Sequence, residues 1–185
     1  MNKLLIDYCK SRLANSNYKP EYKEVTNTSF AKFIVDVAEC IDDIRECDIL
    51  PFGMTNYEYE YKITSEDLTD MMDEGIEAIL SEDVSQKDKE EGAEKIRNAA
   101  YCGLKSATLL LGVHSICDVR SKKDIEFGGI LLHNVAEPSR FTKQGGALAK
   151  ELLDLYYENT LLHIRMSMKK SLRNTAQPTM SKKGN

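Results

Sequence analysis

The stretch AEKIRNAAYCGLKSATLLLG, residues 93–112, indicates the fold class of this 185-residue chain. Its apolar side chains return every three or four residues, which is the spacing of one face of an α-helix. Ser85 and Asp88 precede it with the spacing of an N-terminal capping box. We therefore predict a helix from about residue 86 to Leu111, ended by Gly112. Its expected buried face is Ala93, Ile96, Ala100, Leu104, Ala107 and Leu111.

The same spacing on either side of this stretch predicts four more helices. They cover residues 3–14, 29–46, 65–81 and, at the C-terminal end, about 147–172. The third begins with Thr64 and Asp67, a second capping-box pair. The last would be roughly 40 Å long at about 1.5 Å per residue, so part of it should project or pack on a neighbour. Its apolar stripe is Leu148, Leu152, Leu155, Tyr156, Leu162 and Met166.

Two segments lack the helical spacing. Residues 56–63 alternate tyrosine with charged residues, which favours a short strand or an extended arm. Residues 113–146 contain two glycine pairs and Pro138, and predict a loop-rich excursion with a short strand near 130–133. The whole chain is therefore predicted to be mainly α: a helical bundle of about five helices with a long C-terminal helix. We expect one helical domain over residues 1–173 and an extended basic tail over 174–185.

Charge is distributed unevenly along the chain. Residues 36–94 hold 20 acidic residues against four basic ones, a net charge of −16. Residues 159–185 hold six basic residues and no acidic one, a net charge of +6. Such segments can attract each other between subunits, or the basic tail can contact nucleic acid. The basic residues are Arg165, Lys169, Lys170, Arg173, Lys182 and Lys183.

Composition narrows the class of protein further. The longest apolar run, residues 109–113, is far too short to cross a membrane. The N-terminal residues have no signal-peptide pattern, so we expect a cytosolic protein or one assembled in a cytosol. Five cysteines and no signal peptide argue against a disulfide framework, and most of the cysteines should be small buried residues.

A row of carboxylates is expected on one face of the helix at 65–81. Their spacing would suit a metal ion or acid–base chemistry, but a solvated acidic face explains it fully. The opposite face of the same helix is apolar, as such a surface helix requires. The predicted acidic face consists of Glu66, Asp70, Asp73, Glu74 and Glu77.

The remaining chemical candidates are weak. His114 and Cys117 have a spacing that suits zinc, but no second close pair completes four ligands. His133 and His163 would need a nucleophile, and no catalytic signature surrounds them. The glycine pairs 128–129 and 145–146 lack the residues of a phosphate-binding loop and are interpreted as hinges. We predict no enzyme, no cofactor and no metal site.

Three segments resemble the head-to-tail adaptor, or connector ring, proteins of tailed bacteriophages. They are TSEDLTDMMDEGIEAIL (64–80), residues 93–112, and GGALAKELLDLYYENTLLHIRMSM (145–168). Within the last, LYYEN is similar to a short connector signature, although Thr160 stands where an arginine is usual. The resemblance implies a non-catalytic virion ring subunit assembled in the host cytoplasm. Its tail, from Arg165 onward, would reach the portal or an adjacent subunit, with DNA nearby.

A second hypothesis remains open beside the connector. The acidic middle of the chain can also belong to a small binding or inhibitory protein, such as a regulatory or anti-defence protein that mimics nucleic acid. A third, an enzyme with a site around His114, His133 and His163, rests only on the presence of these side chains.

Overall fold

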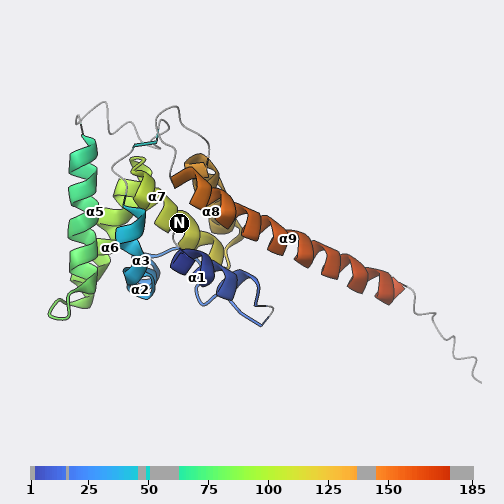
Figure 1. The fold of residues 1–185 in the computed structure, drawn as a ribbon. Helices are drawn as coiled ribbons and strands as arrows, with labels where there is room; N and C mark the ends of the chain where they lie inside the picture. The colour runs from blue at the N-terminus through green and yellow to red at the C-terminus, as the bar shows by residue number, and fades with distance from the viewer. Residues whose placement is uncertain (1–2, 16, 46–48, 51–62, 137–144, 176–185) are drawn as a thin grey trace, which may run out of the picture.

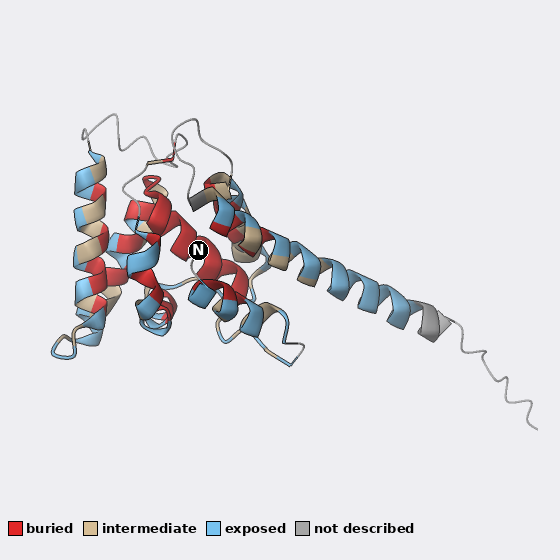
Figure 2. Ribbon diagram, viewed as in Figure 1, coloured by how far each residue is buried: buried red, intermediate tan, exposed pale blue. Residues whose placement is uncertain are grey.

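A single buried helix lies at the centre of the fold. The computed structural model describes residues 3–15, 17–45, 49–50, 63–136 and 145–175. In it, all thirteen residues of α7 (Lys105–Cys117) are buried. A helix that is apolar or uncharged on almost every side needs neighbours all around it. Figure 2 shows this core helix surrounded by other elements. Its neighbours are α1 (Lys3–Leu13), α2 (Asn27–Asp36), α6 (Gln86–Tyr101), α8 (Lys122–Ala136) and the start of α9 (Gly145–Thr175).

Helices α5 (Ser65–Leu80) and α6 form a closely packed hairpin beside this core (Figure 1). Both predicted capping boxes are confirmed, because Thr64 and Ser85 each accept a hydrogen bond from the backbone N–H of the aspartate three residues later. Gly75 of α5 and Gly92 of α6 lie against each other where the two helices pack. A Cβ atom on Gly75 would lie 2.5 Å from the Gly92 carbonyl oxygen, so only glycine permits this packing distance.

The predicted single helix over 86–111 is wrong, because α6 ends at Tyr101 and α7 begins at Lys105. Gly103 adopts a φ of 92°. The Gly103 N–H donates to Ala100 O and the Leu104 N–H to Ala99 O, which is the Schellman arrangement that ends helices. A glycine in this conformation carries no Cβ penalty, and the chain turns sharply to bring α7 into the core.

The predicted loop-rich excursion at 113–146 is also wrong over most of its length. Helix α7 continues to Cys117, and α8 occupies Lys122–Ala136, including the predicted strand at 130–133. Gly112 does not end a helix. A Cβ on Gly128 would lie 2.9 Å from its carbonyl oxygen, so these two glycines let α7 and α8 touch. The sequence predicts a helix end at Gly112 and a hinge at the pair 128–129, but Gly112 and Gly128 lie inside helices and allow close packing. Residues 137–144 lie outside the described part.

The predicted helix over 29–46 is divided into α2 and α3 (Ala38–Ile44) at Val37. Phe30, Phe33 and Ile41 of these two helices lie in the core. The helix at 3–14 is confirmed as α1, and its buried residues are Leu5, Ile6 and Cys9. The predicted strand at 56–63 lies almost entirely outside the described residues.

Helix α9 is the long C-terminal helix that the sequence predicts. Its first half packs on α8 and α1, and its second half extends away from the bundle (Figure 1). With this helix, the described residues contain eight helices and no strand, so the mainly α prediction is confirmed and the count of about five is wrong. Within the same residues, no helix combines the length and apolar character needed to cross a membrane.

Candidate interaction surface

The second half of α9 forms an arm that makes little contact with the rest of the protein. We use the name C-terminal arm for residues 161–175 of α9. Every residue from 161 to 171 is exposed, and Figure 2 shows an almost entirely blue helix beyond the core. Isolated helices of this length are marginal in water, since most helical stability comes from packing of an apolar face. The C-terminal arm is therefore a surface that a partner would stabilise.

Four apolar side chains of α9 form a continuous exposed stripe. Tyr157, Leu161, Ile164 and Met168 follow one another at spacings of four, three and four, and each is between 51% and 61% exposed. At about 100° per residue, these positions fall within about 60° of one another around the helix. Alternating spacings of three and four are those of paired helices in coiled coils. We call these four residues the arm stripe.

The stripe predicted from the sequence lies elsewhere on the same helix. Leu148 and Leu152 are buried against the bundle, and Tyr156 and Leu155 pack partly against it. Leu162 and Met166, which continue that stripe, are exposed, because the bundle ends before them. The sequence signal for the arm stripe was the heptad-like spacing from Tyr157 to Met168.

The structure describes the side chains of three of the six predicted basic residues. Arg165, Lys169 and Lys170 are exposed together on the C-terminal arm. Arg173 lies in the last turns of α9, and Lys182 and Lys183 lie outside the described residues. The acidic residues of α9 are Glu151, Asp154 and Glu158, and apart from Lys150 the basic residues of the helix follow them, so its net charge changes from acidic to basic along its length.

The predicted acidic face lies on the outer side of α5. Glu66, Asp70 and Glu77 are exposed there. Asp73 and Glu74 are partly neutralised, because Arg45 contacts Asp73 and Lys95 Nζ lies 2.7 Å from Glu74 Oε2. The described residues contain no group of three or more His, Cys, Asp or Glu side chains placed to hold a metal ion. The five carboxylates give this side of α5 a negative surface charge.

A buried polar cluster centres on Asp118, which follows α7. Its carboxylate accepts hydrogen bonds from the hydroxyls of Tyr8 and Tyr18, each at 2.8 Å. Arg12 Nε and His114 Nδ1 each lie 3.3 Å from a carboxylate oxygen. Burial by itself would raise the pKa of Asp118, but the hydrogen bonds from His114 and the tyrosines lower it below its usual value. Burial and the Asp118 charge raise the pKa of both tyrosines.

Ser29, His114 and Asp118 form a hydrogen-bonded chain with the order of a hydrolase triad. Ser29 Oγ lies 3.1 Å from His114 Nε2. All three side chains are buried, and Ser29 Oγ also accepts from Thr26 N and donates to Thr26 O as part of the α2 capping box. A serine that caps a helix inside the core offers no face to a substrate. This chain therefore ties α2 to α7. Since both ring nitrogens of His114 are engaged in it, the suggested zinc pair with Cys117 is disfavoured.

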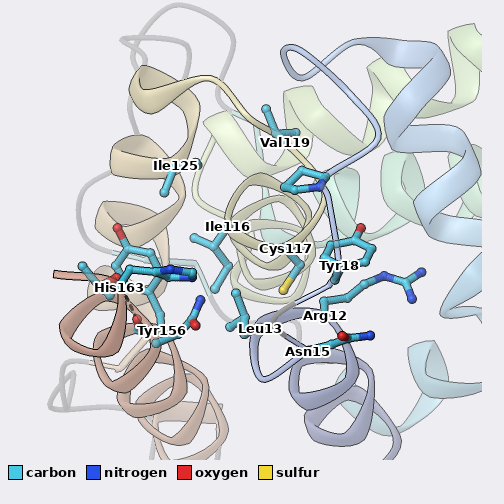
Figure 3. Close-up of a pocket in the computed structure, with 13 residues that line it drawn as sticks. Arg12, Leu13, Asn15, Tyr18, Ile116, Cys117, Val119, Ile125, Tyr156 and His163 are labelled. Carbon is cyan, nitrogen blue, oxygen red and sulfur yellow. Dashed lines mark hydrogen bonds between the residues drawn. The ribbon is translucent and has the colours of Figure 1, made fainter. Parts of the chain in front are cut away.

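A hollow of about 340 Å³ lies where α9 leaves the bundle (Figure 3). Leu13, Ile116 and Ile125 give it apolar walls, and Tyr156 and His163 reach it from α9. Its polar residues Arg12 and Tyr18 belong to the Asp118 cluster. The hollow separates part of α9 from the end of α1, so it marks the root of the C-terminal arm.

The structure places two of the histidines considered for catalysis apart: His133 is exposed on α8, and His114 is buried in the core.

Sequence reasoning missed the Asp118 cluster entirely. Its tyrosines lie 100 and 110 positions from Asp118, and no local pattern connects residues so far apart.

No family model matches the chain, and neither a curated protein nor a solved structure matches it.

Proposed function

We propose that this chain is a non-catalytic assembly protein that joins protein subunits through its C-terminal arm. One observation carries the proposal: a helix with exposed apolar side chains and three basic residues extends beyond the bundle. Exposed apolar surface of this kind marks a site of protein association. The particular assembly suggested by the sequence resemblance is a phage head-to-tail connector, in which the chain is a virion subunit between the portal and tail components.

Light scattering tests this proposal on the full chain and on a chain that ends at Thr160. Residues 161–171 are exposed and lie outside the core, so both chains should have the same melting temperature. We expect the full chain to form oligomers, or to bind a candidate portal protein, and the shortened chain to do neither. The proposal is contradicted if both the full chain and the shortened chain are monomeric and neither binds the portal protein.

A second candidate function is supported by the outer face of α5. Glu66 and Asp70 lie about one helical turn apart, and Glu77 follows on the same exposed face about two turns further along. Such a row can bind a basic surface as nucleic acid does. The chain would then be a small inhibitory or regulatory binder. A charge-reversed α5, with lysine at these three positions, separates the candidates: it should abolish inhibitor binding and leave arm-dependent association intact.

A further inference from the structure

The arm stripe is self-complementary: it can pack against the arm stripe of a second copy of the chain. We propose that two copies of this chain pair through their C-terminal arms, with the two α9 helices antiparallel and the arm stripes in contact. This inference rests on the proposed assembly function and names the partner of the arm as a second copy of the chain.

The apolar residues fit an antiparallel pairing because their spacing is symmetric. When the midpoint between residues 162 and 163 lies on the twofold axis, Tyr157 faces the partner's Met168 and Leu161 faces the partner's Ile164. The four stripe residues of each helix then meet over about 18 Å of helix. The contact is isologous, which is the commonest kind between identical subunits.

Charge supports the antiparallel direction. Glu158 and Arg165 each follow a stripe residue directly, so they lie on the same side of it, and both are exposed. Antiparallel pairing places Glu158 beside the partner's Arg165, and symmetry repeats this pair. Thr160 and the partner's Ser167 take the other side and bring no charge. Parallel pairing would instead align the basic end of each helix with the basic end of the other. Flanking charges of this kind set helix orientation more than affinity.

The surface needed for this pairing continues past the root of the arm. Asp154, Tyr157 and Glu158 are exposed although α9 packs on the bundle at this level, because they point away from it. A second helix can therefore lie along residues 154–168 on the outer side. Leu162 and Met166 lie on another side of the helix and stay exposed, as does the acidic face of α5. A larger assembly built from such dimers would need a second interface, and these two surfaces remain exposed for it.

Leu161 and Leu162 provide a matched test. They are adjacent leucines with 53% and 54% exposure, but only Leu161 belongs to the arm stripe. Analytical ultracentrifugation of the full chain should show a monomer–dimer equilibrium. Leu161→Asp should abolish the dimer and Leu162→Asp should preserve it. Circular dichroism and melting temperature should match the original chain for both variants, since neither leucine is in the core.

The charge pair tests the direction. Glu158→Arg and Arg165→Glu should each weaken the dimer about tenfold, because each reversal replaces two attractive contacts with two repulsive ones. The double variant E158R/R165E should restore dimerisation to near the original strength. Failure of the double variant to restore it, a dimer that survives Leu161→Asp, or a chain that is monomeric at every concentration would each overturn the antiparallel pairing.

These outcomes distinguish the inference from the proposed function. Association that requires residues 161–185, but is lost with Leu162→Asp and kept with Leu161→Asp, overturns the antiparallel pairing and leaves the assembly function standing. The proposed assembly function is overturned only if a chain without residues 161–185 associates with itself and with the portal protein as the full chain does.

Discussion

The Nε2 atom of His114 lies 3.1 Å from the Oγ atom of Ser29, a contact that joins the central helix α7 to the first turn of α2. The Nδ1 atom of the same imidazole ring lies 3.3 Å from Asp118 Oδ2. Tyr8 of α1 donates a hydrogen bond to the Asp118 carboxylate, so α1, α2 and α7 meet through one carboxylate and one imidazole.

Removal of the Asp118 carboxylate should strongly destabilise the fold. Asp118→Ala would leave the hydroxyls of Tyr8 and Tyr18 and one nitrogen of His114 without their acceptor. Loss of one partner from a buried charged cluster costs about 3–5 kcal/mol. Urea unfolding should show this decrease in the free energy of unfolding. Asp70→Ala, on the exposed face of α5, should change it by less than about 0.5 kcal/mol. Equal effects of the two variants would contradict the role of Asp118.

The same carboxylate should make stability depend on acid pH. Its pKa is lowered in the folded protein, so its stabilising contribution is present above the ordinary carboxyl pKa of about 4. The contribution is lost as the pH falls through the lowered folded-state value, because the unfolded chain then binds the proton first. Asp118→Asn should be less stable at pH 7 and should lose less stability between pH 7 and pH 3. Parallel pH profiles for the two proteins would refute this linkage.

Neighbouring glycines in α8 should respond oppositely to alanine. A Cβ on Gly128 would lie 2.6 Å from the Ser115 Cβ and 2.9 Å from a backbone oxygen of α7, so Gly128→Ala should cost about 1–3 kcal/mol. The nearest atom to a Cβ on Gly129 is 3.8 Å away, on Tyr156. Gly129→Ala should therefore stabilise α8 by about 1 kcal/mol through helix propensity. Melting curves of the two variants check the difference, and stabilisation by both substitutions would contradict the close contact of α7 and α8 at Gly128.

The thiols of Cys9 and Cys117 should be unreactive in the folded protein. Their sulfur atoms lie 3.6 Å apart, and both side chains are buried. The hydrogen bond to Cys9, followed by burial, raises the pKa of Cys117 well above its ordinary value, which disfavours the reactive thiolate. Mass spectrometry after brief alkylation should find both residues unmodified in the native protein and modified in urea. Rapid modification without urea would contradict the buried position of this pair.

The sequence predicted the fold wherever a local pattern was sufficient. Capping boxes at Thr64 and Ser85 and the apolar spacing of α2, α5 and α9 are properties of adjacent turns, and all of these helices are present. Glycine misled the prediction in both directions. Gly103 ends a helix within a stretch that was predicted to be continuous, whereas Gly112 and Gly128 lie inside helices. A glycine that gives a helix a close neighbour cannot be distinguished from one that ends it without knowledge of that neighbour.

The candidate surface was predicted only in part. The basic residues of the C-terminal arm and the acidic face of α5 were expected as charged surfaces, and the structure places the described ones on exposed helix faces. The arm stripe was not recognised, because burial of residues 148–156 and exposure of the same helix further on depend on where the bundle ends. That boundary is set by α1 and α8 and leaves no mark in the sequence of α9 itself.

The continuity of α9 makes its exposed end dependent on its packed beginning. Residues 161–175 alone form too short a helix to persist in water, and the turns held against α1 and α8 act as the nucleus from which they extend. A chain whose bundle has not yet formed would therefore present a frayed peptide in place of an ordered docking helix. Under the proposed assembly function, newly made molecules would present this helix to a partner only after the bundle has folded.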